Sequence, residues 1–473
     1  MTDNSWAPVL AQADMDYLTG VFSAGPDGCV QPLSSSAVAY VLRCLYDSLD
    51  RPLICVTDGP RTQDILYQDI VTLFDGMLDD VGYYPGWESL PNADIQPHSD
   101  LVGDRLAILL RTVAKRPPKL LVTTIQAMMQ RTIDLETLTD QTIQLTLHQE
   151  KDFEKLTEHL LETGYSFEPQ VTSKGQASRR GGLLDVWPPT EPWPLRLEFF
   201  GSSIDSIRTF DPHEQRSIEH TSGAILSPAT EWADKDRTDL NGDLFSYLPN
   251  STNWIWMDPM SIRHHAQVYE ETIRESNAKR STYRATEVRS LAKQHRGKGD
   301  LSIGPDENPD QTTYELLLQP VEGVPAFPTG TATPLQFERE RERFLNDLGQ
   351  RRNNGAQVVF YFSTEGVKDR FVEQYGTSSN LLKNAPIHVG RLSEGLTVPP
   401  HDLTILTDHD IYGRQKLLRG RYDLHAQRAG PTRMNRRRVE EWTDLKIGEL
   451  VVHIEHGVGK YLGMLEQESH GQR

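Results

Sequence analysis

The chain has 473 residues, enough for about three or four domains, and no apolar run approaches the ~18–20 residues that span a membrane. Its net charge of −18 argues against non-specific nucleic-acid binding by the whole chain, because phosphate contacts need concentrated Lys and Arg. The N-terminus has no signal-peptide pattern, and Cys29, Cys44 and Cys55 lack metal-ligand spacing. We therefore expect a cytoplasmic monomer with buried, reduced thiols and no membrane contact.

Residues 1–140 predict the first part of a nucleotide-binding-like α/β domain. Helical periodicity in SSSAVAYVLRCLYDSL, RTQDILYQDIVTLFDG and SDLVGDRLAILLRTVAKRPP alternates with short apolar runs in PLICVTDG and KLLVTTIQ. Strands that alternate with helices indicate a parallel sheet covered on both faces.

A Gly-x4-Gly spacing joins Gly20 to Gly25 and invites comparison with a phosphate-binding P-loop. That loop needs Lys and Ser or Thr next, but here Pro26 removes a backbone N–H and Asp27 adds negative charge. No lysine precedes Lys115, and no Asp-Glu pair ends an apolar strand. We therefore expect a degenerate loop, no ATP hydrolysis and no bound cofactor in this part of the chain.

Residues 141–222 predict an inserted α+β module. QTIQLTLHQ alternates at strand period, DFEKLTEHLLETGY is an amphipathic helix, and residues 175–211 add short strands joined by a Pro-rich turn. These strands carry Arg180, Arg196 and Phe200. Arginine beside an exposed aromatic is typical of an interface hot spot, whereas arginines paired with Asp185 or Glu198 would be ordinary solvated strand residues. The residues alone leave both interpretations open.

Residues 223–333 continue the first domain, with a strand at WIWMD, one charged helix over residues 260–296 and a solvated loop at GKGDLSIGPDENPDQ. Residues 334–415 predict a second small α/β domain, in which a charged helix is followed by AQVVFYFS, the helix TEGVKDRFVEQYG and DLTILTDHDIYG.

Residues 416–446 predict a basic linker, which is either a solvated segment or a contact for nucleic acid or an acidic partner. The basic residues in and just before it are Arg414, Lys416, Arg419, Arg421, Arg428, Arg433, Arg436, Arg437 and Arg438.

Residues 447–473 alternate apolar residues at strand period, with Gly457 and Gly459 at a turn, and predict the opening strands of a further domain. On a strand His453 and His456 point to opposite faces, so we expect no metal site there.

The segments RGGLLDVWPP, LRLEFF and SIRTFDPHEQRS resemble, in order and spacing, the module with which the excinuclease B-like family binds excinuclease A. GELVVHIEHGVGKYLGM resembles the opening of the RNA-polymerase-interacting domain of transcription-repair coupling factors, a Tudor-like β-barrel shared with CarD-type regulators. Both signatures in this order select the bacterial transcription-repair coupling factor family, with this chain as its N-terminal part.

The resemblance implies that Arg180, Arg196 and Phe200 bind excinuclease A. Ala177 and Ser178 depart from the family, which has an aromatic residue and a first arginine at these positions. The resemblance also implies that a motor downstream of this chain uses ATP, magnesium and double-stranded DNA. It further implies that the partial barrel binds the RNA polymerase β subunit through residues that include Val452, His453, Gly457, Gly459 and Tyr461.

Two alternatives remain. An excinuclease B-like ATPase or helicase relative would need a phosphate site, and excinuclease B also carries a DNA-gripping hairpin for which WESLPNADIQPHSDLVGDRL leaves no room. A CarD-like regulator would bind RNA polymerase without affinity for excinuclease A.

Overall fold

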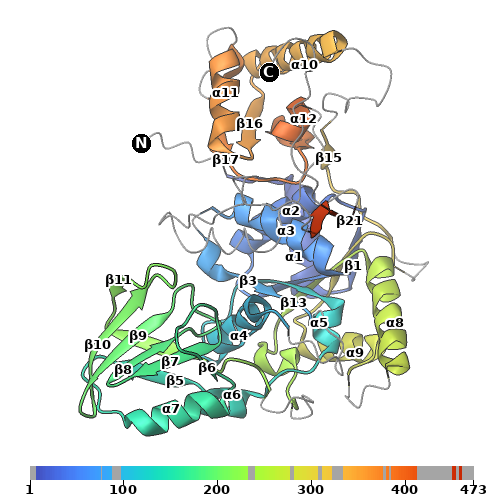
Figure 1. Cartoon of the computed structure of the whole chain (residues 1–473). Coiled ribbons are helices and arrows are strands. Elements are labelled where there is room, and N and C mark those ends of the chain that lie inside the picture. Colours follow the sequence, from blue (N-terminus) through green and yellow to red (C-terminus); the bar gives the residue numbers. More distant parts are fainter. Residues whose placement is uncertain are drawn as a thin grey trace. The chain divides into compact units, whose positions relative to one another are not determined.

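The computed structural model describes most of the chain, which divides into two compact units, residues 1–418 and 419–473, each described by itself (Figure 1). The described residues are 7–75, 77–87, 97–232, 240–276, 282–306, 312–321, 334–375, 380–382, 385–412, 450–453 and 457–460. Within them, no helix is both long and apolar enough to cross a membrane.

Six of the described strands form a parallel sheet in the order β1-β14-β13-β2-β4-β3, which confirms the predicted parallel α/β architecture. The chain leaves this sheet after β4 and returns to it at β13, so a long segment is inserted between the two. The strands are β1 (Gly28–Val30), β2 (Leu53–Thr57), β3 (Val81–Tyr84), β4 (Leu120–Thr124), β13 (Asn253–Met257) and β14 (Leu301–Ile303).

Side-chain hydrogen bonds cap the N-termini of two helices associated with this sheet. The Ser34 side chain accepts a hydrogen bond from Ala37 N and so caps α2, and Thr124 caps α5 in the same way. The elements are α1 (Gln12–Ala24), α2 (Ser35–Ser48), α3 (Pro60–Leu73), η1 (Leu78–Asp80), α4 (Ser99–Val113), α5 (Ile125–Met129), α6 (Leu135–Gln141), η2 (Leu244–Tyr247), α8 (Pro259–Glu275) and α9 (Ala285–His295).

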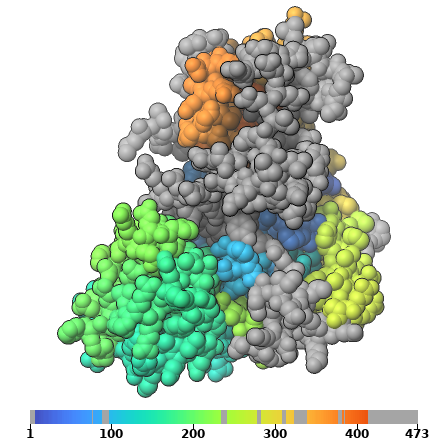
Figure 2. All heavy atoms as spheres, viewed as in Figure 1, coloured from blue at the N-terminus to red at the C-terminus, as the bar shows by residue number. Residues whose placement is uncertain are grey.

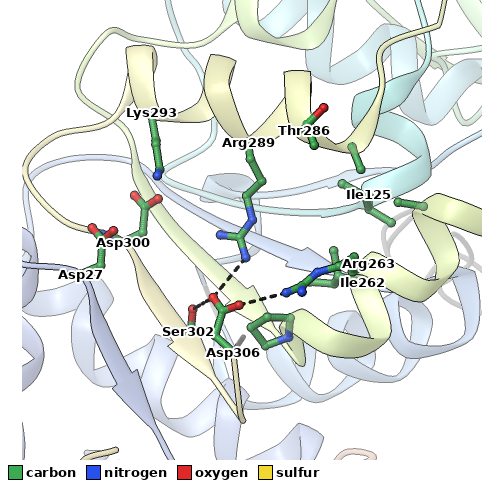
Figure 3. Close-up of a pocket in the computed structure, with 13 residues that line it drawn as sticks. Asp27, Ile125, Ile262, Arg263, Thr286, Arg289, Lys293, Asp300, Ser302 and Asp306 are labelled. Carbon is green, nitrogen blue, oxygen red and sulfur yellow. Dashed lines mark hydrogen bonds and ion pairs between the residues drawn. The ribbon is translucent and has the colours of Figure 1, made fainter. Parts of the chain in front are cut away.

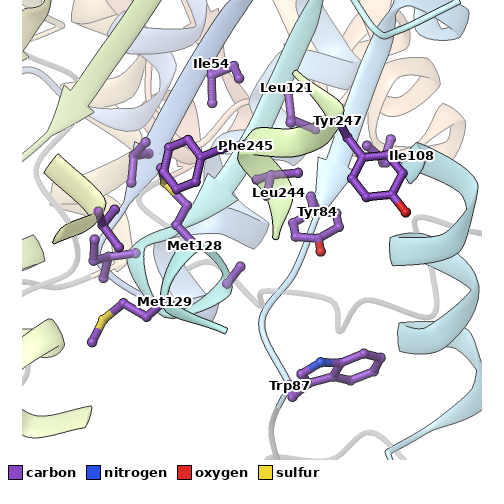
Figure 4. Close-up of a cluster of buried hydrophobic side chains, with 14 of the residues drawn as sticks. Ile54, Tyr84, Trp87, Ile108, Leu121, Met128, Met129, Leu244, Phe245 and Tyr247 are labelled. Atoms are coloured by element: carbon purple, nitrogen blue, oxygen red, sulfur yellow. The ribbon is translucent and has the colours of Figure 1, made fainter. Parts of the chain in front are cut away.

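A large hydrophobic cluster lies on one face of this sheet, where strand residues such as Ile54 and Leu121 meet Met128, Phe245 and Tyr247 (Figure 4). Cys29, Cys44 and Cys55 are free and buried, as predicted, and burial raises the pKa of the Cys55 thiol to about 12.

Two sequence-based predictions in this region are wrong. Residues 260–296 form two helices, α8 and α9, instead of one. The predicted loop GKGDLSIGPDENPDQ contains β14, which is buried between β1 and β13. A strand of three residues between glycines has too short an apolar run to show periodicity, and only its neighbours in the sheet reveal it.

The predicted degenerate loop was also placed in the wrong register. Gly20 lies inside α1, and Gly25 ends that helix with a φ of 57° ahead of a cis bond to Pro26. A phosphate loop connects a strand to the following helix, and here that connection is residues 31–34, between β1 and α2. It reads QPLS, so it also lacks the lysine of a P-loop.

The inserted segment forms an α+β module, seen in Figure 2 as a continuous lobe coloured teal to green. Its strands build a sheet in the order β11-β10-β9-β8-β7-β6 and a separate antiparallel pair, β5 with β12. Strand pairing in the module therefore extends beyond its predicted end at residue 222. The elements are β5 (Ile143–Thr146), α7 (Phe153–Glu162), β6 (Ser166–Phe167), β7 (Gln176–Arg180), β8 (Leu183–Val186), β9 (Leu195–Phe200), β10 (Ser203–Phe210), β11 (Ser217–His220) and β12 (Gly223–Leu226).

A further sheet has the order β15-β18-β19-β16-β17 and mixes parallel and antiparallel pairs. Two of its strands, β16 and β19, lie in the segments AQVVFYFS and DLTILTDHDIYG, as predicted. The elements are β15 (Gln319–Pro320), α10 (Pro334–Asn353), β16 (Gln357–Phe362), α11 (Glu365–Tyr375), η3 (Asn380–Leu382), β17 (Ile387–Val389), β18 (Leu396–Val398), η4 (Pro399–His401), β19 (Leu403–Thr407) and α12 (Asp408–Tyr412).

In the second unit, β20 (Leu450–His453) and β21 (Gly457–Lys460) form an antiparallel hairpin. Gly457 and Gly459 were expected at the turn, but they lie on β21, paired with His453 and Val451. Tyr461, the basic linker 416–446 and residues 88–96, which are nine of the 20 residues of WESLPNADIQPHSDLVGDRL, lie outside the described residues.

The inserted module is tied to the first sheet by a fully buried ion pair. Arg105 on α4 donates to Glu231 through Nε at 2.7 Å and Nη2 at 3.3 Å, and both side chains are 0% exposed. Nearby, Gly103 packs directly against the Pro189 carbonyl of the module. Burial opposes the charge of Arg105, but Glu231 outweighs it and raises the pKa of the guanidinium.

Gly103→Ala is expected to destabilise the chain by about 1–3 kcal/mol, although alanine is the better helix former. The added methyl group would overlap the Pro189 carbonyl oxygen, which is backbone and cannot rotate away. Urea unfolding measures the loss. Gly20→Ala is the matched control, because Gly20 lies within α1 with nothing within 4 Å of an added Cβ, and it should be neutral or stabilising. Equal effects at the two positions would contradict the proposed contact.

Candidate functional site

The six-stranded sheet of the inserted module has two different faces. Alternation along the strands directs Ala177, Leu184 and Leu197 toward Leu156 and Leu160 of α7, where all five are buried. The opposite face, called the outer face below, carries polar residues and one exposed aromatic ring. It includes Arg180, Leu183, Asp185, Arg196, Glu198, Phe200, Ser206 and Arg208.

Phe200 is the most exposed feature of the outer face. Its side chain is 84% exposed, whereas the preceding Phe199 turns inward and packs edge-on against Phe153 of α7. The ring stands at the end of β9, where the chain turns at Gly201 into β10, so its backbone is held by cross-strand pairing. Single exposed aromatics are common on proteins, but a rigidly held one on a face that also carries arginines has the composition of an interface hot spot.

Arg180 lies at the end of β7 and is exposed, as predicted. Its guanidinium donates a hydrogen bond to the carbonyl of Pro169, which orients the side chain. Its neighbour Arg179 projects the other way, stacks on Phe153 at 4.8 Å and pairs with Glu154 of α7. The two adjacent arginines therefore serve opposite faces of the sheet.

Arg196 was expected to be an exposed contact, and the structure corrects this. Its side chain is only 15% exposed, and Nε and Nη2 donate to the Asp185 carboxylate at 2.7 and 2.8 Å. The guanidinium also stacks on Phe210 at 4.4 Å. The hydrogen bonds to Asp185 raise the pKa of Arg196. Of the two interpretations left open, pairing with Asp185 is the observed one.

The remaining charges of the outer face form a network that the sequence did not indicate. Glu198 accepts from Ser206 Oγ at 2.7 Å and pairs with Arg208, both on β10. The alternation of SIRTF indicates that Ser206 and Arg208 share a face, but their pairing with Glu198 depends on the register between β9 and β10. A bulge between Ile204 and Ser206 sets that register.

The two departures from the family pattern are both buried. Ala177 is 0% exposed and packs into the core under α7. Ser178 is 2% exposed and donates to the carbonyl of Pro169 at 3.1 Å. Neither side chain is therefore available at the surface, and the outer face depends on the residues named above.

In the second unit, Val452 and His453 lie on β20, and Gly457 and Gly459 lie on β21. The structure places four of the five predicted polymerase-contact residues on one hairpin, and Tyr461 lies outside the described residues.

Two family models match parts of the chain. Residues 143–232 match the UvrB interaction domain, a range that contains β5 to β12 and Glu231. Residues 445–473 match the CarD-like/TRCF RID domain, which includes the β20–β21 hairpin.

Among curated proteins, the chain is similar to transcription-repair-coupling factors from several bacteria. It is 22% identical to the protein of Bacillus subtilis over 93% of this chain and 42% of the relative. It is 22% identical to that of Escherichia coli over 95% of this chain and 43% of the relative. Against the Myxococcus xanthus protein, the identity is 32% over 46% of this chain and 18% of the relative. The chain thus spans about two fifths of the length of the relatives that it matches nearly throughout.

Proposed function

We infer that this chain, which corresponds to the N-terminal part of the transcription-repair-coupling factors, recruits excision repair to stalled transcription. The outer face of the inserted module binds excinuclease A, and the segment that begins at residue 447 opens a Tudor-like barrel for the RNA polymerase β subunit. The first domain is a degenerate P-loop-like fold. ATP, magnesium and double-stranded DNA belong to a motor beyond these residues.

The observation that carries this proposal is that the exposed Phe200 on β9 and the exposed Arg180 on β7 lie on the same face of one sheet, inside the range that matches the UvrB interaction domain. An aromatic ring and an arginine whose backbones are held in one sheet lose little conformational entropy on binding, which favours a defined protein contact. The predicted boundaries at residues 140, 333 and 415 remain part of the proposal, whereas the pairing of β12 with β5 carries the inserted module past the predicted boundary at residue 222.

The expected contact of Arg196 with excinuclease A stays a prediction, and in our proposal this residue also has a positioning role. Because it pairs with Asp185, whose side chain is 2% exposed, it holds β8 and β9 together and so positions Phe200. Arg196→Ala would leave a buried carboxylate unpaired and disturb the sheet itself. It is therefore a poor probe of direct contact.

Phe200→Ala is expected to weaken binding of excinuclease A by about 30-fold, equivalent to about 2 kcal/mol, and Arg180→Ala by about tenfold or more. Biolayer interferometry with the full chain, without ATP or polymerase, measures both. Two controls are matched. Leu161→Ala removes another exposed apolar residue, on α7 at the opposite face, and Arg179→Ala removes the adjacent arginine. Both should bind as wild type does.

Wild-type affinity of the Phe200→Ala and Arg180→Ala variants would exclude the outer face as the contact. Binding to RNA polymerase with no affinity for excinuclease A would instead favour the CarD-like regulator. ATP turnover above background would favour an excinuclease B-like ATPase.

A further inference from the structure

The last strand of the first sheet along the chain, β14, lies beside a pocket of about 440 Å³ under α8 and α9 (Figure 3). Among the described residues that line this pocket, three cations face three carboxylates. Arg263 and Arg289 lie 3.0 and 3.6 Å from the carboxylate of Asp306, just beyond β14. These ion pairs hold the end of the first sheet in place, and the balance of charge favours no charged ligand. The charged lining residues are Asp27, Arg263, Arg289, Lys293, Asp300 and Asp306.

Residues 314–317, called the strap below, run alongside β1 at the edge of the first sheet. Tyr314 pairs in parallel with Val30. Its N–H donates to the carbonyl of Cys29 at 2.8 Å, and its carbonyl accepts from the N–H of Gln31 at 3.2 Å. An unpaired edge strand invites association with other chains, and the strap covers part of this edge.

Buried side chains hold the strap on the first sheet. Asp14 of α1 is 0% exposed and accepts hydrogen bonds from the Tyr314 hydroxyl and the Leu317 N–H, both at 3.0 Å. The Gln31 side chain donates to the carbonyl of Leu316 and accepts from its N–H, both at 2.9 Å. A buried carboxylate is costly unless it is hydrogen-bonded, so release of the strap would be penalised.

The strap enters the sheet β15-β18-β19-β16-β17, called the second sheet below, with almost no intervening chain. Only Leu318, which is 7% exposed, separates the strap from β15. One residue spans at most about 3.6 Å, so the second sheet cannot move far from the first at this point while the strap is bound.

The second sheet also meets α3 of the first domain through the loop that follows β17, and this is called the α3 contact below. Thr72 on α3 accepts a hydrogen bond from the N–H of Arg391 at 3.0 Å, and Gln68 donates to the carbonyl of Arg391 at 3.2 Å. Asp69, which is 0% exposed, accepts a hydrogen bond from the backbone N–H of Ser393. Side chains of one helix thus bind backbone groups of the loop and set its position.

Gly390 permits the close approach of this loop to α3. A Cβ added there would lie 2.5 Å from Cγ2 of Thr72 and 3.2 Å from Cδ1 of Tyr361. Thr72 cannot rotate its methyl group away without moving the hydroxyl that binds Arg391. Any larger residue at position 390 would therefore push the loop away from α3.

We propose that the strap and the α3 contact make the second sheet a fixed extension of the first domain, so that the two move as one body. Polar contacts between domains usually permit relative motion. Here the attachments lie at two separate places, the edge of β1 and α3, and each uses a buried carboxylate, Asp14 or Asp69. Two separate attachments restrict rotation as well as translation. Binding of excinuclease A by the inserted module is not required for this rigidity.

Double electron–electron resonance between two spin labels on the full chain tests the proposal. The labels are attached through Asp50→Cys in the first domain and Glu373→Cys on α11, which follows β16, and both positions are exposed. Cys29, Cys44 and Cys55 are buried and stay unlabelled. We expect one narrow distribution of distances between the labels. A broad distribution, or one with several peaks, would overturn the proposal.

Gly390→Ala should widen or shift this distribution, because the added methyl group meets Thr72. Adding Thr72→Ser should restore it, because serine lacks Cγ2 and keeps the hydroxyl that binds Arg391. Gly366→Ala is the matched control, because Gly366 lies on α11 with nothing within 4 Å of an added Cβ, and it should leave the distribution unchanged.

The α3 contact is excluded if Gly390→Ala leaves the distribution unchanged, or if Thr72→Ser does not restore it. Should Gly390→Ala fail to fold, Thr72→Ala is the second variant. It removes the hydroxyl that accepts from Arg391 without adding bulk, so it should also widen the distribution. A wild-type distribution in Thr72→Ala would then overturn the proposal.

Discussion

Replacing Glu231 with alanine is expected to lower the free energy of unfolding by about 3–5 kcal/mol, a large part of the ~5–15 kcal/mol typical of a domain. The change would leave the Arg105 guanidinium buried and without its carboxylate. Thr132 would also lose the acceptor that its hydroxyl meets at 2.5 Å. Arg105 would keep the Pro85 carbonyl at 2.9 Å and the rings of Tyr84 and Trp87, which cannot neutralise its charge.

Urea unfolding of wild type and Glu231→Ala gives the loss directly. The control is the double variant Arg105→Met with Glu231→Leu, which removes both charges and keeps much of the volume. It should recover most of the lost stability, because buried ion pairs seldom outperform well-packed apolar residues. A double variant as unstable as the single one would show that the packing of this joint, and not the uncompensated charge, accounts for the loss.

The buried ion pair of Arg105 and Glu231 also shows which parts of the structure the sequence could predict. The strands β2 and β4 follow from short apolar runs that are buried along their whole length, and the helices α2 to α4 follow from apolar residues at helical period. The partners Arg105 and Glu231 are 126 residues apart and belong to no motif. Only the path of the chain, out of the first sheet and back, brings them together.

The candidate site shows the same division. The alternation of LRLEFF predicts that Phe200 and Arg196 share a face, and they do. It does not predict that Asp185 lies opposite Arg196, because this depends on the register between β8 and β9. The pocket under α8 and α9 had no sequence signal at all. Its charged residues are drawn from separate segments of the chain, and its floor is the short strand β14, which resembled a loop.

Asp300→Asn is expected to stabilise the chain by about 3 kcal/mol at pH 7.5. Burial, together with the nearby carboxylate of Asp27, raises the pKa of Asp300 from 3.8 to about 6, against the opposing influence of Arg296 and Arg289. Between pH 3.8 and about 6, the carboxyl group of Asp300 is ionised in the unfolded chain but still protonated in the folded chain. Wild-type stability therefore falls as the pH rises from about 4 to about 6, and the deficit persists at higher pH. Asparagine cannot ionise and escapes this penalty.

The test compares urea midpoints of wild type and Asp300→Asn across this range of pH. The advantage of the variant should be about 3 kcal/mol at pH 7.5, about half of that at pH 5 and nearly absent at pH 4. Other titrating groups affect both proteins alike, so the difference isolates Asp300. A difference that does not change with pH would mean that Asp300 titrates alike in the folded and unfolded chains. An advantage that grows toward low pH would reverse the sign and show that the carboxylate is stabilised by Arg296 and Arg289 rather than penalised by burial.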